Sequence, residues 1–454
     1  MSTDADELLR SLAGDDADPS GPRPALGWVD VRTVGTHSMP VPAGPDLLAH
    51  RPHRSPLRAL AWIVSVLALC VAYVGATLLW PAESIALTVS PAEQAPLAAP
   101  AAAPAWPAEG SAAVGVAGFE GSLATTTDAA SMASITKVVT ALLVLDRMPL
   151  AVGEQGPSYA FTEADQEDYL TYLYRDESAL DVPVDGTLTQ YQLLQGMLIG
   201  SAGNYADRLV TELWGSTESF VLDAQAWLTG HGIAGITIVD PTGLDPANAA
   251  APAALIALAH EALSNPVIAE IVRTPLVELP GVGAVENTND LLTDPSIAGI
   301  KTGSLDDEFS LLAAKDVAVA GATVRVYAVV LAQPDDSTRD ETAAALLDQT
   351  AAELAQPASI PAGTVVATVT SPWGRSSQAI TDAAADVALW NGATATVTPQ
   401  VEVVDRTAGA TVGELVVAGP LTKASVPVRL TVDIPPPSGW WRLTHPLQVF
   451  GLAD

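Results

Sequence analysis

The chain of 454 residues contains one cysteine, Cys70, which lies inside an apolar run. A single cysteine excludes a disulfide framework within the chain and any metal site built from several thiolates. The six histidines form no His-Glu-x-x-His motif, so the zinc-peptidase motif is missing. We therefore expect an activity that needs no metal and no organic cofactor.

Positive charge is also scarce. Lys and Arg number 20 against 52 Asp and Glu, and the formal net charge is -32. Binding of nucleic acid requires a basic face, so this balance argues against nucleic acid as a partner and against general adhesion to anionic lipid. Apolar residues make up 49% of the chain, and its length is sufficient for two or three globular domains.

One long stretch lacks charge altogether. Residues 59–80 are apolar or small, and at about 1.5 Å per residue a helix of this length crosses a hydrocarbon layer of about 30 Å. Trp62 and Trp80 fall near its two ends, where indole rings favour the membrane interface. We predict a transmembrane helix over residues 58–80.

The flanking charges predict the orientation of this helix. Arg51, Arg54 and Arg58 precede it, and the next basic residue is Lys137. The positive-inside rule then places the N-terminus in the cytoplasm and the remainder of the chain outside the cell membrane. A cleaved signal peptide is the alternative, but the apolar run is too long for one and too far from Met1.

Composition divides the rest of the chain. Strand-like and helix-like runs alternate through the middle, with a buried strand predicted over 324–332 and an amphipathic helix over 340–355. Short β-branched runs then indicate a small all-β domain. The predicted parts are a disordered cytoplasmic tail (1–57), the transmembrane helix (58–80), an Ala/Pro-rich linker acting as a spacer (81–110), a catalytic domain (111–355), a β-rich domain (356–434) and a tail (435–454). Trp440 and Trp441 in that tail fit either packing on the β-rich domain, which we favour, or a place in the membrane interface.

The chain has only four lysines, and two of them stand in chemical motifs. Ser134 and Lys137 form an S-x-x-K at the start of a predicted helix, where a spacing of three puts both side chains on one face. A serine hydroxyl needs a base to become a nucleophile, and a buried lysine of lowered pKa can serve. The other interpretation is a helix-capping serine beside a solvated lysine.

The second motif is K-T-G, formed by Lys301, Thr302 and Gly303 within a predicted strand. Lysine and threonine together can hold a carboxylate by charge and by hydrogen bonding, and glycine lets a substrate backbone approach closely. A turn with an exposed lysine is the alternative for this motif alone.

S-x-x-K followed by K-T-G resembles the pattern of penicillin-recognising serine enzymes. The surrounding sequence is similar to that of the low-molecular-mass D-alanyl-D-alanine carboxypeptidases, in segments such as ASMASITKVVTALLVLD, VDPTGLDPANAAAPAALIALAHEAL and IAGIKTGS. The resemblance covers residues 111–355. It implies an α+β, transpeptidase-like fold, in which helices flank an antiparallel sheet, with a helical lobe, followed by a small all-β domain.

The resemblance also implies roles for individual residues. Ser134 would be acylated by a peptidoglycan stem peptide ending in D-Ala-D-Ala, with Lys137 as general base, and β-lactams would inhibit by acylating the same serine. Lys301 and Thr302 would bind the terminal carboxylate, and the N–H groups of Ser134 and Ser304 would form the oxyanion hole. Lys301 is also expected to keep Lys137 neutral by like-charge repulsion.

The family's middle motif, Ser-x-Asn, is altered. Ser201 fits the serine, which would relay a proton, but Gly203 occupies the asparagine position and the asparagine follows as Asn204. Three interpretations stand: a bulged loop lets Asn204 act, the enzyme works more slowly without the amide, or the site is degenerate. Asp306, Asp307 and Glu308 after K-T-G would repel an anionic substrate unless they form a solvated turn, which we favour.

Other functions share parts of this pattern. A β-lactamase would add a carboxylate that positions the deacylating water, and no E-x-x-L-N motif lies between Ser201 and Lys301. A catalytically degenerate protein that binds penicillin or muropeptides is supported by Gly203. An endopeptidase or transpeptidase would carry the same motifs.

Overall fold

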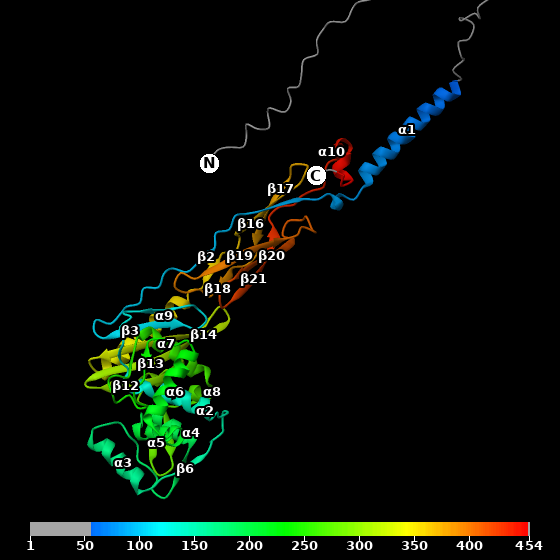
Figure 1. The fold of residues 1–454 in the computed structure, drawn as a ribbon. Helices are drawn as coiled ribbons and strands as arrows, with labels where there is room; N and C mark the ends of the chain where they lie inside the picture. Colours follow the sequence, from blue (N-terminus) through cyan, green and yellow to red (C-terminus); the bar gives the residue numbers. More distant parts are fainter. Residues whose placement is uncertain (1–55, 453–454) are drawn as a thin grey trace, which may run out of the picture. The chain divides into compact units, whose positions relative to one another are not determined.

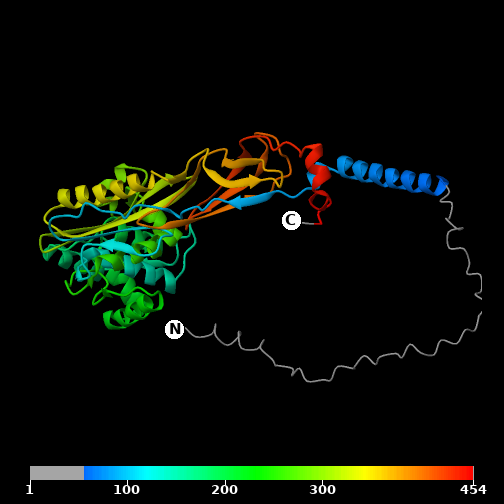
Figure 2. The same cartoon turned by 90° about the horizontal axis from the view of Figure 1, so that it is seen from above.

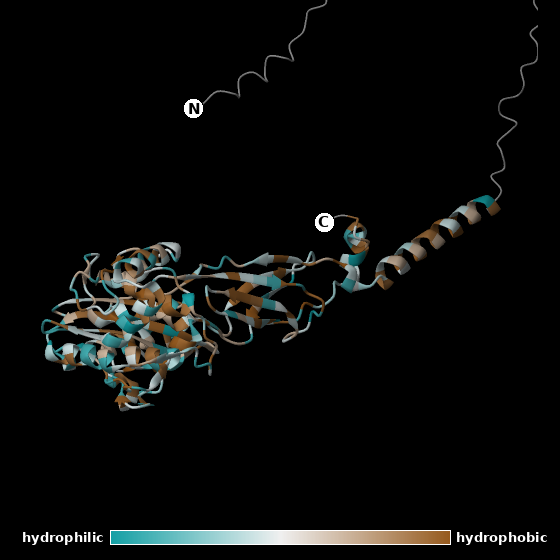
Figure 3. Cartoon of the chain, turned by 60° about the horizontal axis from the view of Figure 1, so that its bottom comes forward, coloured by the Kyte–Doolittle hydropathy of each residue, from teal (hydrophilic) through white to brown (hydrophobic). Residues whose placement is uncertain are grey.

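The computed structural model describes residues 56–452, in a first unit that ends at Ala72 and a second that begins at Tyr73. The predicted cytoplasmic tail lies outside the described residues, apart from its last two positions. Helix α1 (Pro56–Leu79) is the one helix in the described chain long and apolar enough to cross a membrane, and Figure 3 shows its hydrophobic colouring. Its bounds agree closely with the span predicted over 58–80.

A five-stranded antiparallel sheet forms the centre of the second unit, in the order β12-β13-β14-β3-β4. Its strands are β3 (Ser111–Val116), β4 (Ser122–Ala124), β12 (Ile297–Leu305), β13 (Glu308–Val319) and β14 (Ala322–Gln333). β14 contains the predicted strand 324–332, and every residue of β3 is buried. The centre of the sheet is therefore covered on both faces.

Helices cover the two faces of this sheet. Helix α9 (Asp336–Leu354) packs on β13 and β14, and α7 (Pro252–Ser264) packs on β3 and β14. Figure 2 shows α9 in yellow on one side and the green helices on the other. Along β14, Val326 contributes to the apolar cluster under α9 and Tyr327 to the cluster on the opposite face. This alternation follows from the two-residue period of a strand.

A helical lobe is built around helix α2 (Thr136–Arg147), and its helices lie together in Figure 1. The other helices are α3 (Glu163–Tyr174), α4 (Gln190–Ile199), α5 (Gly203–Trp214), α6 (Thr217–Gly230) and α8 (Pro266–Ile271). Short strands connect them: β5 (Ala130–Ser131), β6 (Ser158–Ala160), β7 (Thr187–Thr189), β8 (Ile236–Thr237), β9 (Ala249–Ala250), β10 (Leu276–Leu279) and β11 (Gly283–Glu286). The predicted sheet flanked by helices, with a helical lobe, is confirmed.

The β-rich region forms a seven-stranded sheet in the order β1-β16-β17-β21-β20-β19-β2. Its bounds are β1 (Thr88–Pro91), β2 (Leu97–Ala98), β16 (Val365–Thr370), β17 (Ser376–Thr381), β19 (Thr394–Val401), β20 (Thr411–Ala418) and β21 (Lys423–Leu430), and β15 (Ala358–Ile360) pairs with β18 (Ala385–Val387) beside it. The predicted C-terminal β domain is confirmed.

The first two strands of that sheet correct one prediction. Residues 81–110 are not a spacer throughout, because β1 pairs with β16 and β2 pairs with β19. Both strands lie at the edges of the sheet, and β1 ends at Pro91, which an edge strand tolerates. The two strands have only four and two residues within an Ala- and Pro-rich stretch, so the composition of the stretch concealed this pairing.

The C-terminal tail forms two short helices, α10 (Gly439–Thr444) and α11 (Pro446–Val449). Trp441 packs edge-on against Trp373, as favoured from the sequence, whereas the side chain of Trp440 is 76% exposed. Arg442 donates hydrogen bonds of 2.9 Å to the carbonyls of Leu78 and Trp80, just where α1 ends. A basic side chain in this position satisfies carbonyls that the helix end leaves free.

Candidate active site

Ser134 lies in a short 3-10 turn (Ala133–Ile135) that leads directly into α2. One turn later, Lys137 projects to the same side, and its Nζ lies 2.8 Å from the Oγ of Ser134. The lysine is only 1% exposed. The S-x-x-K spacing therefore produces a direct contact between a hydroxyl and a buried amine, rather than a solvated lysine.

The loop after β8 presents a second partner to the lysine. Lys137 Nζ donates a hydrogen bond of 2.6 Å to the carbonyl of Thr242. The carboxylate of Asp240 holds this loop by accepting hydrogen bonds from Thr242 N, Gly243 N, Asp245 N and Asn248 Nδ2, at 2.6–2.9 Å. Gly243 has a φ of +83°, and a Cβ added to it would lie 1.9 Å from the carbonyl oxygen of Ala133. The loop thus packs directly on the turn that carries Ser134.

Burial lowers the pKa of Lys137 to about 8, although the carboxylates of Asp240 and Asp207 oppose the shift. Burial was one of the two causes expected from the sequence; the other, repulsion by Lys301, is not among the causes of this shift. Like-charge repulsion acts on Lys301 instead. Its pKa is lowered well below the ordinary value, first by burial and then by Lys137 and Arg339. A lysine with a pKa near 8 is partly neutral at physiological pH and can act as a base.

This pKa leads to a pH prediction. With Lys137 as the base that activates Ser134, the rate of acylation should rise with pH, reach half its maximum near pH 8 and level off above that. The second-order rate constant for labelling by a fluorescent penicillin, measured from pH 5.5 to 9.5, checks this. A flat profile, or a midpoint below pH 6, would contradict the assignment of Lys137 as the base.

Strand β12 brings the K-T-G motif to the same place, which confirms that the motif lies on a strand. A Cβ added to Gly303 would lie 3.0 Å from the carbonyl oxygen of Met132 and 3.3 Å from the backbone N of Ser134. Because β12 is at the edge of its sheet, one side of its backbone faces away from the other strands. The K-T-G strand therefore packs closely on the turn that carries Ser134, and the outer edge of β12 is not paired within this sheet.

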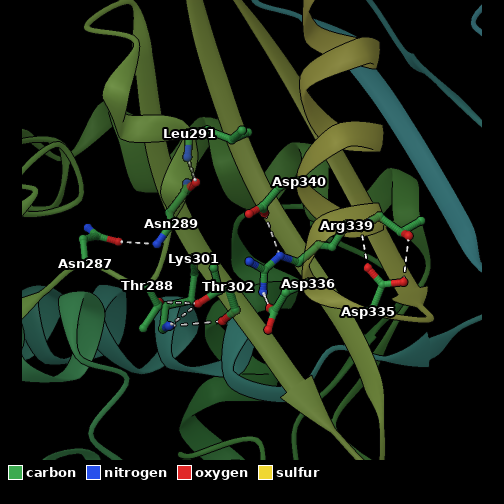
Figure 4. Close-up of polar contacts among 11 residues, drawn as sticks. Asn287, Thr288, Asn289, Leu291, Lys301, Thr302, Asp335, Asp336, Arg339 and Asp340 are labelled. Carbon is green, nitrogen blue, oxygen red and sulfur yellow. Dashed lines mark hydrogen bonds and ion pairs between the residues drawn. The ribbon is translucent and has the colours of Figure 1, made fainter.

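Lys301 is 2% exposed, and its Nζ donates hydrogen bonds to the carbonyl and the Oγ1 of Thr302, at 3.1 and 3.3 Å. Thr302 Oγ1 also shares a 2.5 Å hydrogen bond with Thr288 Oγ1. Both donors of the K-T-G motif are thus fixed in place (Figure 4). In the same view, the side chain of Asn287 accepts a hydrogen bond from Asn289 N, and that of Asn289 accepts one from Leu291 N, so both fix the loop before β12.

Arg339 is a cation that the sequence reasoning missed. It lies in the first turn of α9, is 4% exposed, and forms ion pairs with Asp336 and Asp340 (Figure 4). Its charge contributes to lowering the pKa of Lys301, so the two cations share one electrostatic environment. The only available signal was a lone arginine in an acidic stretch, which ordinarily indicates a solvated helix start.

The altered middle motif lies between α4 and α5. Ser201 is buried, with a φ of +60°, and Gly203 is the first residue of α5. The side chain of Asn204 accepts a hydrogen bond from Leu180 N and donates one to Leu180 O, at 3.2 and 2.8 Å. Its amide is therefore engaged by the backbone of the segment after α3.

The residues after K-T-G form the tight turn between β12 and β13. Asp306 and Asp307 have φ values of +51° and +63°, and both they and Glu308 are exposed. Positive φ at two central residues is typical of a hairpin turn, and Asp tolerates it. The charges are thus solvated, as favoured from the sequence. Ser304, at the end of the motif, is exposed as well.

Comparison with known proteins agrees with this geometry. Residues 124–335, which contain both catalytic motifs, match the family model of the D-alanyl-D-alanine carboxypeptidases. No curated protein sequence matches the chain. The D-alanyl-D-alanine carboxypeptidase DacD from Francisella tularensis has the same fold, with 16% identity, a TM-score of 0.50, and coverage of 76% of this chain and 98% of that one.

Two further solved structures are similar. Penicillin-binding protein 5 from Haemophilus influenzae is 16% identical, with a TM-score of 0.48 and coverage of 75% of this chain and 98% of that one. The Streptomyces K15 DD-transpeptidase is 22% identical, with a TM-score of 0.47 and coverage of 57% and 98%.

The fold and the family match define the class as a serine peptidase of the penicillin-binding type. More particularly, the region around the two motifs, residues 124–335, matches the D-alanyl-D-alanine carboxypeptidase family. The protein is a serine-type D-Ala-D-Ala carboxypeptidase that acts on peptidoglycan.

Proposed function

We propose that Ser134 is the residue acylated during the reaction and that Lys137 is its general base. The observation that carries this assignment is the 2.8 Å contact between Lys137 Nζ and Ser134 Oγ at a lysine whose pKa burial lowers to about 8. Neutral Lys137 takes the hydroxyl proton as Oγ attacks the carbonyl carbon of the penultimate D-alanine. The backbone N–H groups of Ser134 and Ser304 stabilise the resulting oxyanion.

The terminal carboxylate binds Lys301 and Thr302. In the free site Lys301 is buried with its pKa lowered, so an anionic carboxylate supplies the partner that favours its charged form. The substrate peptide lies along the edge of β12, where Gly303 leaves room for its backbone. Arg339 adds positive potential behind Lys301.

The carbon–nitrogen bond to the terminal D-alanine then breaks. The leaving amine receives its proton from Lys137 through Ser201, and the acyl group remains on Ser134 as an ester. Water attacks this ester, the hydroxyl of Ser134 is regenerated, and the shortened stem peptide leaves. A β-lactam forms the corresponding ester, but its ring opens and no leaving group departs.

We further propose that α1 crosses the cell membrane once, with the N-terminus in the cytoplasm and the catalytic domain outside. The uncharged length of the helix and the arginines that precede it support this orientation. An external protease added to intact spheroplasts should degrade the catalytic domain. A chain that is degraded only after lysis would contradict the orientation.

The assignment of Ser134 is tested by release of D-alanine from a diacyl-Lys-D-Ala-D-Ala peptide, with the full chain in detergent. Wild-type protein should release D-alanine, and Ser134→Ala should release none. Ser376→Ala, an exposed serine of β17, is the matched control and should keep full activity. Release by Ser134→Ala at the wild-type rate would refute the assignment.

A further inference from the structure

The position that lacks its asparagine is not an open space. A Cβ added to Gly203 would lie 2.6 Å from Cε1 and 3.3 Å from Cζ of Tyr172, and 3.2 Å from the carbonyl oxygen of Ser178. The φ of Gly203 is in the ordinary range for a helix start, so the backbone conformation does not require glycine. The ring of Tyr172, from helix α3, requires it, because this ring occupies the volume that a side chain at residue 203 would need.

Tyr172 is held in this place by a residue of the same helix as Gly203. Its hydroxyl donates a short hydrogen bond to Oδ2 of Asp207, which lies four residues after Gly203 on α5. Residues four apart lie on one face of a helix, so the ring spans from the missing side chain to the next turn. The hydroxyl and the ring are thus fixed to the same helix face.

Three consecutive residues at the start of α5 fasten the segment that follows Tyr172. Gly203 N donates to the carbonyl of Ser178 at 2.9 Å, Asn204 bonds both backbone groups of Leu180, and Tyr205 Oη donates to the carbonyl of Asp181 at 2.6 Å. The segment that follows α3 is therefore attached to the first turn of α5 at three successive points. Asn204 belongs to this attachment, and its side-chain amide is directed at the backbone of Leu180.

The Tyr172–Asp207 pair lies within electrostatic reach of the catalytic base. Burial raises the pKa of Asp207; the hydrogen bond from Tyr172 opposes this shift, Asp240 adds to it, and Lys137 also opposes it. In the other direction, Asp207 acts with Asp240 to raise the pKa of Lys137. Asp207 and Lys137 are thus coupled electrostatically, and the helices that carry them, α5 and α2, pack on each other.

We propose that Tyr172, anchored by Asp207, takes the place of the side chain that the middle motif lacks and is a positioning residue for Ser201 and Lys137. The inference rests on the proposed function, in which Lys137 and Ser201 move the proton. In this proposal, glycine at residue 203 does not mean that the site has lost its activity. The polar side chain of Tyr172, from helix α3, fills the volume that the asparagine of the motif would occupy.

The experiment is a double-mutant cycle between residues 172 and 203, using the full-length chain in detergent. Tyr172→Ala empties the position and should lower the rate constant for labelling by fluorescent penicillin by about tenfold to 100-fold, since misplaced catalytic groups have effects of this size. Gly203→Asn should lower it as well, because the new side chain overlaps the ring. The double variant Tyr172→Ala/Gly203→Asn should recover to within about threefold of wild type.

Tyr172→Phe keeps the ring in place and provides a variant that opens no cavity. It loses only the bond to Asp207 and should be slowed less than Tyr172→Ala. Losses that simply add in the double variant, or a Tyr172→Phe rate as low as that of Tyr172→Ala, would overturn the proposal. Should Tyr172→Ala not fold, as judged by its thermal unfolding, Gly203→Asn alone decides: a wild-type rate would overturn it.

Two reference proteins separate this inference from the proposed function. Wild-type protein that is not labelled, or Ser134→Ala that still is, would refute the assignment of Ser134 itself. Labelling that depends on Ser134 together with an additive cycle would refute only the role of Tyr172.

Discussion

Replacing Lys137 with methionine should slow acylation of Ser134 by about 10²- to 10⁴-fold, the usual contribution of a positioned general base. Methionine is similar in length and suits a buried position, but it cannot take the proton from a hydroxyl 2.8 Å away. The carbonyl of Thr242 also loses its partner. The measurement is the second-order rate constant for penicillin labelling at pH 9, where wild-type Lys137 is mostly neutral.

Lys423→Met is the matched control, since this lysine is exposed at the start of β21. It should be labelled at the wild-type rate. Thermal unfolding of Lys137→Met should remain a single cooperative transition, because a buried amine that burial already disfavours is replaced by an apolar group. Labelling of a folded Lys137→Met at a rate near that of wild type would refute a role for this lysine as base.

Local patterns in the sequence predicted those parts of the fold and the site that depend on neighbouring residues. The three-residue spacing of Ser134 and Lys137 puts both on one face of a helix, whatever surrounds them. The apolar run 324–332 forms a strand because alternate residues meet apolar layers on both faces of the sheet. K-T-G lies on a strand because it continues a buried apolar run, Ile297–Ile300.

Contacts between distant segments were not predictable in this way. Strands β1 and β2 pair with the edges that β16 and β19 offer, and with four and two residues each is too short to stand out in the sequence. Arg339 and Tyr172 come from helices with acidic, exposed surfaces, and no spacing rule relates them to Lys301 or Gly203. Sequence reasoning identified the missing asparagine, but only the packing of α3 on α5 shows which residue fills its place.

Gly243 packs directly on the turn that carries Ser134, so we expect a large effect when it is replaced by alanine. Gly243→Ala should destabilise the protein and disable Ser134 together. The residue has a φ of +83°, and its Cβ would lie 1.9 Å from the carbonyl oxygen of Ala133 and 2.4 Å from the carbonyl carbon. Both atoms are backbone and cannot rotate away, so either the loop or the turn must move. The loop carries the Thr242 carbonyl that orients Lys137, so both sides of the displacement affect the base and its nucleophile.

Gly321→Ala is the control that separates the backbone strain of a positive φ from the steric contact made by the new Cβ. Gly321, in the turn between β13 and β14, has a similar φ of +77°, with no atom within 4 Å of an added Cβ. This control carries only the backbone strain, about 1–2 kcal/mol for a left-handed residue, and should label normally. Gly243→Ala should lose about 1–3 kcal/mol more, the usual effect of overpacking, and its labelling should fall by at least about tenfold. The measurements are the unfolding temperature and the penicillin-labelling rate of both variants. Equal values for the two variants would mean that the loop yields without disturbing Ser134, and that the Thr242 carbonyl is not needed to hold Lys137 in place.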